Sequence, residues 1–293
     1  MRTGLGHGVV EKGNESNLCR WTGRWKRRPE AAGCLVLAPL RSTVKEAPSI
    51  INSFEPITLA EMDSVKLQDR SDTKYVLAEA QLPKVLEAMR EHYRVLEVDG
   101  VRGTAYRSLY YDTPDLQHYQ DHHNKRTFRV KVRFREYIGS GLVFLEVKRK
   151  TGRGRTDKAR IRVEAIPQEM SAEQTAFVNK ASRSDAPLEP SLWNHFTRYT
   201  FVSKTSPERL TMDLGLRYTD PNGEGDLGGI VVAELKQERA DRSSHFVEIM
   251  RAMGQRPAGM SKYCVGLLTL QRPVKHNAFK EVLLRLQRLR KAA

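Results

Sequence analysis

Cysteine is scarce in this sequence, and so are long hydrophobic runs. Its three cysteines, Cys19, Cys34 and Cys264, are too few and too scattered for a disulfide framework or a zinc cluster. No apolar run approaches the roughly 18 residues of a transmembrane helix, and no secretion signal is recognisable. These absences predict a cytoplasmic protein of a reducing compartment, either free or held at the inner face of a membrane by a protein partner.

Acidic residues are too few to balance the basic ones. The chain of 293 residues has 35 Asp and Glu against 50 Lys and Arg, which gives a formal net charge of +15. This excess favours an anionic partner, which can be nucleic acid, polyphosphate, a nucleotide or an acidic membrane surface. The net charge alone does not choose among them.

The chain divides into three parts by composition. Residues 1–49 show no sustained hydrophobic period and hold nine Lys or Arg against four Asp or Glu, a net of +5. We expect a disordered basic extension there, or a start codon placed too far upstream. Residues 50–272 should form the folded domain. Residues 273–293 should form a basic amphipathic helix that packs on this domain or contacts a membrane or a membrane protein.

Short strand-like segments dominate the folded domain, and several follow one another as in hairpins. Strands are predicted at 70–77, 94–98, 104–111, 127–137, 142–150, 158–165, 198–203, 209–214 and 230–237. Helices are predicted at 82–92, 114–122, 171–180, 243–253 and 277–291. At least eight strands therefore predict an α+β fold with an antiparallel sheet or barrel and helices packed outside.

One predicted strand alternates cations with apolar residues. Side chains alternate in direction along a strand, so one face carries Arg129, Lys131, Arg133 and Arg135, and the other carries Val130, Val132 and Phe134. Neighbouring like charges on one face repel each other. Such a face predicts either contact with water or a groove that binds a polyanion.

Other predicted strands repeat this pattern of charge at every second residue. The alternating residues are Asp72 and Lys74; Glu146, Lys148 and Lys150; Lys158, Arg160 and Arg162; Arg209 and Asp213; and Glu234 and Lys236. Each strand alone is typical of a solvated face. Together, the cationic faces favour a basic tunnel, in which bound anions or carboxylates offset repulsion and desolvation. One of the carboxylates can hold a divalent metal, because hard cations prefer oxygen ligands.

In these residues the sequence resembles the VTC domain, the polyphosphate polymerase domain of the triphosphate tunnel metalloenzyme or CYTH-like superfamily, in its stand-alone prokaryotic type. The resemblance runs from about residue 54 to 270. Its markers, specific in this order, are Arg70-x-Asp72-x-Lys74-Tyr75, Tyr110-Tyr-Asp-Thr113, Lys131-Val-Arg-Phe-Arg135, Phe144-Leu-Glu-Val-Lys148, Gly154-Arg155-x-x-Lys158, Arg209-Leu-Thr-Met-Asp213, Glu234-Leu-Lys236 and Ser261-Lys-Tyr263.

The resemblance implies an eight-stranded antiparallel β tunnel, a closed barrel with helices packed outside, whose basic side chains bind triphosphate or polyphosphate. The implied phosphate ligands are Lys74, Arg133, Arg135, Lys148, Lys158, Arg198, Arg209 and Lys262, and Glu234 is implied to bind the catalytic Mn²⁺ or Mg²⁺. The hydrolase and cyclase branches of the superfamily begin with Glu-x-Glu-x-Lys, whereas this chain has Arg70-x-Asp72-x-Lys74, which favours the polymerase branch. Phe196 departs from the pattern, which has tyrosine at this position. The phosphate-sensing and membrane domains of the eukaryotic proteins are also absent from this sequence.

The expected function is that of a metal-dependent polyphosphate polymerase, with ATP and inorganic polyphosphate as its partners. The first alternative is a hydrolase of triphosphate or polyphosphate on the same scaffold. The second is a non-catalytic subunit that binds or senses polyphosphate. Nucleic acid is not expected as a partner, because single-strand binders present aromatic side chains among their cations, whereas Phe128 and Phe134 face away from Arg133.

Overall fold

The computed structural model describes residues 47–63, 71–152 and 156–291. Its elements are α1 (Ala47–Asn52), β1 (Pro56–Ile57), α2 (Leu59–Asp63), β2 (Ser71–Ala78), η1 (Glu79–Gln81), α3 (Leu82–Met89), β3 (Tyr93–Leu96), β4 (Gly103–Asp112), α4 (Gln117–His123), β5 (Arg129–Tyr137), β6 (Leu142–Lys150), β7 (Thr156–Val163), α5 (Ala172–Ser182), β8 (Glu189–Ser203), β9 (Glu208–Asp220), β10 (Gly223–Asp226), β11 (Ile230–Gln237), α6 (His245–Ala252), α7 (Lys262–Thr269), η2 (Asn277–Phe279) and α8 (Lys280–Lys291). Residues 1–46 of the predicted extension lie outside the described residues, as do the markers Arg70 and Gly154-Arg155.

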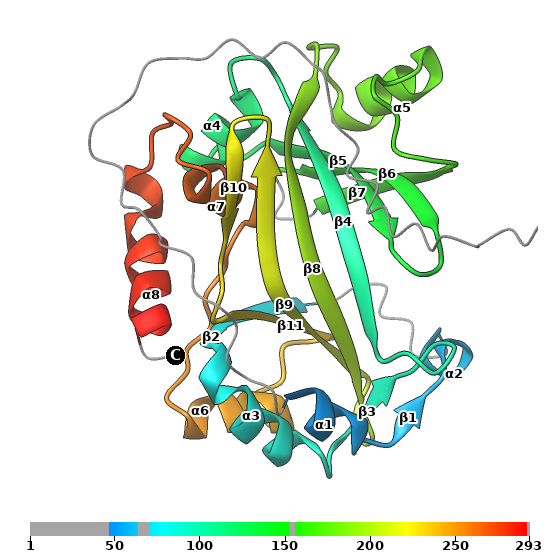
Figure 1. The fold of residues 1–293 in the computed structure, drawn as a ribbon, viewed down its shortest axis with the longest axis vertical. Helices are drawn as coiled ribbons and strands as arrows, with labels where there is room; N and C mark the ends of the chain where they lie inside the picture. The colour runs from blue at the N-terminus through cyan, green and yellow to red at the C-terminus, as the bar shows by residue number, and fades with distance from the viewer. Residues whose placement is uncertain (1–46, 64–70, 153–155, 292–293) are drawn as a thin grey trace, which may run out of the picture.

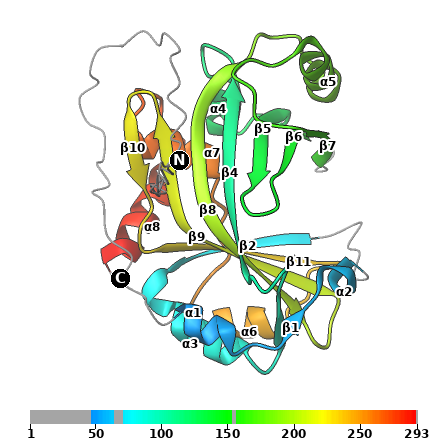
Figure 2. The same ribbon diagram turned by 45° about the vertical axis from the view of Figure 1, so that its right-hand side comes forward.

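The fold is α+β, as predicted, and its centre is one large antiparallel sheet. The strands follow the order β2-β11-β9-β8-β4-β5-β6-β7. Figure 2 shows the long strands β8 and β4 upright at the centre, with β5, β6 and β7 at the upper right and β2 and β11 crossing below. Within the described residues no pairing joins β7 back to β2, so the predicted closed barrel is not confirmed.

Two strands are much longer than predicted, for a local reason. β8 begins at Glu189 and β9 ends at Asp220, whereas the sequence pattern predicts 198–203 and 209–214. Their pairing register shifts between His195 and Thr197, and Gly215 opposite this shift has a φ of 63°. A bulge places one extra residue in a strand, so the alternation of apolar and polar side chains breaks there. The pattern therefore hides the half of each strand that lies beyond the bulge.

Helices pack on both faces of the sheet, in three places (Figure 1). α1, α3 and α6 pack against β2, β9 and β11 in one apolar cluster, which includes Leu77 and Phe246. α7 and α8 pack in a second cluster, where Leu283 and Leu286 of α8 are buried. α5 packs on β5, β6 and β7 in a third cluster. Val132 of that cluster is buried, as the alternation in β5 predicts.

The sequence pattern did not reveal α7. Ser261 caps this helix, because its Oγ accepts a hydrogen bond from the Cys264 amide at 3.2 Å. All residues from Tyr263 to Thr269 are buried, so the helix has no polar face that would produce a period of 3.6 residues. Among the described residues, no helix is long and apolar enough to cross a membrane.

Candidate functional site

The strand register brings the predicted site residues to one face of the sheet. Directly paired residues share a face, as do alternate residues on one strand. The linking pairs across the sheet are Lys74 with Glu234, Glu234 with Thr211, Asp213 with Arg198, Arg198 with Thr104, Ser108 with Arg135, Arg133 with Glu146, and Lys148 with Lys158. We call this surface the charged face. It carries eight of the nine predicted site residues, and Lys262 approaches it from α7.

A row of three lysines crosses β5, β6 and β7. Lys131 is paired with Lys148, and Lys148 is paired with Lys158. Like charges directly opposite each other destabilise a sheet. The charges of Arg133 and Arg135, together with burial, hold the pKa of Lys148 well below its usual range. This row therefore concentrates positive charge at a point where an anion would relieve the repulsion.

One carboxylate, Glu146 on β6, contacts two arginines of β5. Glu146 Oε2 accepts a hydrogen bond from Arg133 Nε at 2.7 Å and lies 2.5 Å from Arg133 Nη2 and 4.0 Å from Arg135 Nε. Burial alone would raise the pKa of Glu146, but the charges of Arg133 and Arg135 outweigh it and hold the pKa at about 2. Glu146 is therefore ionised at neutral pH, and its one negative charge faces several cations.

Arg135 is the least satisfied of these cations. It is 8% exposed, and its Nε has no hydrogen-bond partner in the described structure. Burial and the charge of Arg133 lower the pKa of Arg135, and Glu146 offsets them in part. A buried guanidinium with an unpaired N–H is costly unless a ligand completes its hydrogen bonds. An anion with several oxygen atoms can do so.

A second group of charges lies on β8, β9 and α7, and it is internally paired. Asp213 is 2% exposed; its Oδ1 accepts from Arg198 Nε at 2.6 Å, and its Oδ2 accepts from Arg198 Nη2 at 2.8 Å and Lys262 Nζ at 2.5 Å. Burial would raise the pKa of Asp213, but the charges of Lys262 and Arg198 reverse this and lower it. Asp213 thus fixes two of the predicted phosphate ligands in position.

Aromatic rings connect the two charge groups. Tyr106 and Phe196 stack with centroids 5.3 Å apart, and the Arg198 guanidinium lies 5.4 Å from each ring centroid. The Arg135 guanidinium also lies 5.4 Å from the Tyr106 ring centroid. Lys262 Nζ is 5.0 Å from the Phe196 ring centroid. The phenyl ring of Phe196 therefore supports Arg198 and Lys262 by cation–π contact, although the family pattern has tyrosine here.

The third group lies on β2, β9 and β11. Lys74 is paired with Glu234, Lys236 is paired with Arg209, and Lys236 Nζ lies 3.5 Å from Glu234 Oε1. Burial lowers the pKa of Lys236 to about 8, although the charge of Glu234 opposes this.

Lys74 also connects two distant parts of the sheet. Burial is the main cause that lowers the pKa of Lys131 on β5, and the charge of Lys74 contributes to the same shift. β2 and β5 are separated by β11, β9, β8 and β4 in the sheet, so the sheet must curve to bring their lysines within electrostatic reach. Lys131 is half-buried, and its Nζ donates to Ser261 Oγ at 3.0 Å.

Sequence reasoning gave no role to Tyr110. Its hydroxyl accepts a hydrogen bond from Arg133 Nη1 at 3.1 Å. Burial would raise the pKa of Tyr110, but the charges of Arg133 and Lys131 outweigh it and lower the pKa. The phenol can therefore donate its own proton to an anion on the charged face. In the sequence, only its place in the Tyr110-Tyr-Asp-Thr113 marker could have indicated a functional role for this tyrosine.

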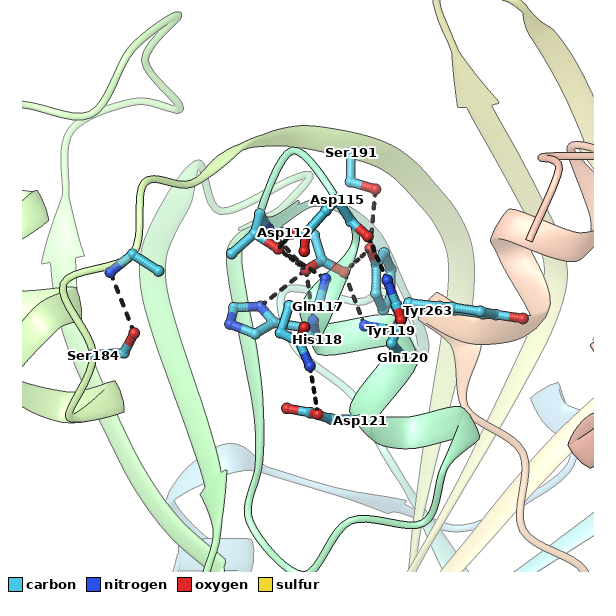
Figure 3. Close-up of polar contacts among 12 residues, drawn as sticks. Asp112, Asp115, Gln117, His118, Tyr119, Gln120, Asp121, Ser184, Ser191 and Tyr263 are labelled. Carbon is cyan, nitrogen blue, oxygen red and sulfur yellow. Dashed lines mark hydrogen bonds and ion pairs between the residues drawn. The ribbon is translucent and has the colours of Figure 1, made fainter. Parts of the chain in front are cut away.

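The next residues of that marker position the site. Figure 3 shows the buried Asp112 carboxylate at the centre of a hydrogen-bond network. It accepts from the backbone amides of His118 and Tyr119 at 2.8 and 3.0 Å and from Tyr263 Oη at 2.5 Å. Asp112 thereby joins β4, α4 and α7. Because Tyr263 follows Lys262, this network helps to hold Lys262 against Asp213.

The environment of Glu234 fits a metal that arrives with phosphate. Burial would raise the pKa of Glu234, but the charges of Lys236 and Lys74 outweigh it and hold the pKa at about 2, so the carboxylate is available as a ligand. No group of three or more His, Cys, Asp or Glu in the described residues could hold a metal by itself. Mg²⁺ commonly binds one or two carboxylates together with substrate phosphates. Glu234 is suited to this mode rather than to a protein-only metal cage.

The structure places the nine predicted residues unequally. Arg133, Arg135 and Lys148 lie together near Glu146, while Arg198 and Lys262 meet at Asp213. Lys74, Arg209 and Glu234 belong to the third group. Lys158 is exposed on β7, the last strand in the sheet order. Besides Tyr110, sequence reasoning assigned no role to Lys236, and only its place beside Glu234 on the charged strand face could have indicated one.

The curved antiparallel sheet with a cationic inner face defines a protein built to bind a polyanion. The VTC domain family model matches residues 69–271, and the chain belongs to this family. This confirms the resemblance seen in the sequence. The family supports an activity on polyphosphate or triphosphate.

The solved structures that match this chain share little of its sequence, and their TM-scores are low. HpAC1 from Hippeastrum, described as a candidate adenylyl cyclase with a dominant triphosphatase activity, is 15% identical, with 66% of this chain and 93% of that chain covered and a TM-score of 0.42. A candidate adenylate cyclase from Vibrio parahaemolyticus is 15% identical, with 68% and 99% covered and a TM-score of 0.39. The Pct1 RNA triphosphatase of S. pombe, in complex with the Spt5 CTD, is 12% identical, with 86% and 96% covered and a TM-score of 0.26. No curated protein matches the chain significantly.

Proposed function

We propose that this protein is a metal-dependent polyphosphate polymerase, which transfers the γ-phosphate of ATP to a growing polyphosphate chain on the charged face. One observation carries the proposal: β5, β6 and β7 concentrate cations around the Glu146 carboxylate, and the buried Nε of Arg135 has no hydrogen-bond partner among the described residues. A polyphosphate chain has a negative charge on each unit, so it supplies counter-charges along the whole face. A small anion would occupy only one part of it.

We also propose that the charged face encloses the chain as a tunnel. The effect of the Lys74 charge on Lys131 supports this, because the two lysines come from strands far apart in the sheet order. A phosphate chain between them would turn their repulsion into attraction on both sides.

The proposed step forms one bond and breaks one bond. A terminal oxygen of the polyphosphate chain bonds to the γ-phosphorus of ATP, and the bond from this phosphorus to the β–γ bridging oxygen breaks. ADP leaves with the electron pair of the broken bond, and the chain gains one phosphate. The attacking oxygen is already ionised, so no general base is needed.

The protein contributes position and charge. Arg133, Arg135 and Arg198 offer planar forks that match phosphate oxygens, whereas Lys74, Lys148 and Lys262 act as point charges. Asp213 and Glu146 limit the movement of the arginines they bind. A divalent metal held by Glu234 would supply further neutralisation of charge on the phosphates.

The test is to incubate the protein with ATP and Mn²⁺ or Mg²⁺ and to separate the products by size. Polymerase activity predicts polyphosphate chains and ADP. Release of orthophosphate alone would instead indicate the hydrolase, and tight binding of polyphosphate without turnover would indicate a non-catalytic subunit.

Glu234→Gln should abolish most of the chain growth, because it removes the proposed metal ligand and keeps the side-chain size. Glu224→Gln is the matched control, since Glu224 has a 75% exposed side chain in β10 and lies 3.7 Å from Arg217, away from the charged face. Unchanged polymer yield in Glu234→Gln would contradict the metal assignment.

A further inference from the structure

A second basic site lies on the outer face of β2 and β11. A pocket of about 450 Å³ lies beside α6 and the segment that follows it. Figure 1 shows α6 below β2 and β11. Thr73 and Tyr75 line this pocket, while Lys74 between them points to the charged face. The pocket and the charged face therefore lie on opposite sides of the same strands.

Arginine supplies most of the charged side chains that line this pocket. Arg242, Arg251 and Arg256 line it, and Asp241 is its one acidic lining residue. Asp241 Oδ1 accepts hydrogen bonds from the Ser243 amide and hydroxyl, both at 2.8 Å, so this carboxylate is already engaged. Three guanidinium groups against one engaged carboxylate leave the pocket with a net positive charge. Planar arginine forks match the oxygen atoms of phosphate groups.

A buried phenol adds a polar group to the same pocket. Tyr75 is 2% exposed, and no hydrogen bond of its hydroxyl is found within residues 47–63, 71–152 and 156–291. Its ring is held edge-on against Phe246, with centroids 5.5 Å apart. Burial raises the pKa of Tyr75, and the nearby charge of Arg251 opposes this shift. The phenol is therefore protonated at neutral pH and close to a guanidinium.

The walls of the pocket are held in place by backbone contacts. Arg251 Nη2 donates to the Arg242 carbonyl at 3.4 Å, which connects α6 to the loop before it. The amide of Ala258 donates to the Lys74 carbonyl at 2.7 Å, which fixes the segment that carries Arg256 to β2. Gly254, with a φ of 66°, allows the turn between α6 and this segment. The three arginines thus come from parts of the chain that are tied together.

We propose that this outer pocket binds a small, multiply charged phosphate anion of the pyrophosphate type, at a site separate from the charged face. The guanidinium groups of Arg242, Arg251 and Arg256 contact the phosphate oxygens, and the Tyr75 hydroxyl donates to one of them. This binding requires neither turnover nor metal, so it goes beyond the proposed polymerase activity and can fail or succeed independently of it.

The experiment is equilibrium dialysis of the whole protein with radiolabelled pyrophosphate, without ATP or divalent metal, at physiological salt. Two sites per chain are expected. Arg251→Gln/Arg256→Gln should lose one site and keep the other, whereas Arg133→Ala should lose the site that the double variant keeps. Arg217→Gln/Arg288→Gln removes the same charge from exposed arginines elsewhere and should keep both sites.

The Tyr75→Phe variant distinguishes a loss of binding from a loss of folding. The phenol hydroxyl has no partner in the described residues, so this variant should unfold at the same urea concentration as wild type. It should weaken the outer site by at least about tenfold, since a hydrogen bond to a charged group contributes about 1.5–3 kcal/mol. An Arg251→Gln/Arg256→Gln variant that binds as many pyrophosphate ions as wild type would overturn the proposal even if polyphosphate synthesis is found.

Discussion

The two ends of the charged face treat their cations differently. On β8, β9 and α7, Arg198 and Lys262 share the buried carboxylate of Asp213 in three short contacts. On β5, β6 and β7, three lysines lie side by side, and Glu146 is shared between Arg133 and Arg135. The first end is balanced by the acid of the protein itself. The second end gains its balance only when an anion binds, and we call the two the paired end and the open end.

The difference indicates a division of labour. A paired cation is fixed in position before substrate arrives, which favours catalysis by positioning. An open cation keeps its full attraction for phosphate, at a cost in stability of the empty protein. The ring of Tyr106 connects the two ends, because it lies under both Arg135 and Arg198 at 5.4 Å. These two arginines therefore form a matched pair for experiments.

The largest expected effect is on stability. Arg198→Met should lower the free energy of unfolding by about 3–5 kcal/mol, because it leaves the buried Asp213 with Lys262 alone. Arg135→Met should change it by less than about 1 kcal/mol or increase it, since it replaces a poorly paired buried cation with an apolar side chain. Urea unfolding at pH 7 without phosphate measures both. Equal losses in the two variants would break the distinction between the ends.

The same Arg135→Met protein should synthesise polyphosphate much more slowly than wild type. Loss of one positioned donor to the transferred phosphate is expected to slow polymer formation about 10²–10³-fold. Initial rates with saturating ATP give the effect, and Arg217→Met, at an exposed arginine of β9, should retain the wild-type rate. A folded Arg135→Met protein with full activity would show that the open end does not bind the reacting phosphates.

The Tyr263–Asp112 hydrogen bond also stabilises the paired end. Tyr263→Phe removes the 2.5 Å hydrogen bond from Tyr263 to Asp112 and should cost about 1.5–3 kcal/mol of stability. Tyr111→Phe is the control, because the buried Tyr111 hydroxyl has no hydrogen-bond partner in the described structure and its removal should cost nothing. Thermal or urea unfolding compares the two. Equal stabilities would mean that the Asp112 network does not hold α7.

The smallest expected effect is a pH dependence near Lys236. Because burial lowers its pKa to about 8 from an ordinary 10.5, the unfolded chain binds more protons between these values, and the empty protein should become more stable as pH rises through this window. Phosphate affinity should move in the opposite direction and fall about fivefold above pH 8, since one charge contact contributes about 1 kcal/mol. Tripolyphosphate titrations at pH 7 and pH 9 measure this fall, and Lys236→Met should not show it.

The faces of the strands could be predicted because alternation is a local property. The register of β5 confirms that Arg133 and Arg135 share one side, and Val132 and Phe134 are buried on the other. β6 and β11 also have the predicted bounds. The functional roles of the nine residues stay predictions, although the structure places their side chains on or beside one face.

The pairing of charges could not be predicted, because it depends on the order of the strands. The alternation in the sequence places Asp213 on the same strand face as Arg209. In the structure, however, the Asp213 carboxylate binds Arg198 from β8 and Lys262 from α7. Neither contact is local. The curvature that brings Lys74 towards Lys131 is likewise a property of the whole sheet.

The most direct measurement of the open end is the affinity for tripolyphosphate of wild type and of Lys148→Gln/Lys158→Gln. Calorimetric titration, with urea unfolding of the empty proteins, gives both quantities. The double variant should bind at least about tenfold more weakly, because two contacts to phosphate are lost, and yet be at least as stable as wild type without ligand. Unchanged affinity, or a marked loss of stability in the empty variant, would contradict a face whose cations are balanced by bound phosphate.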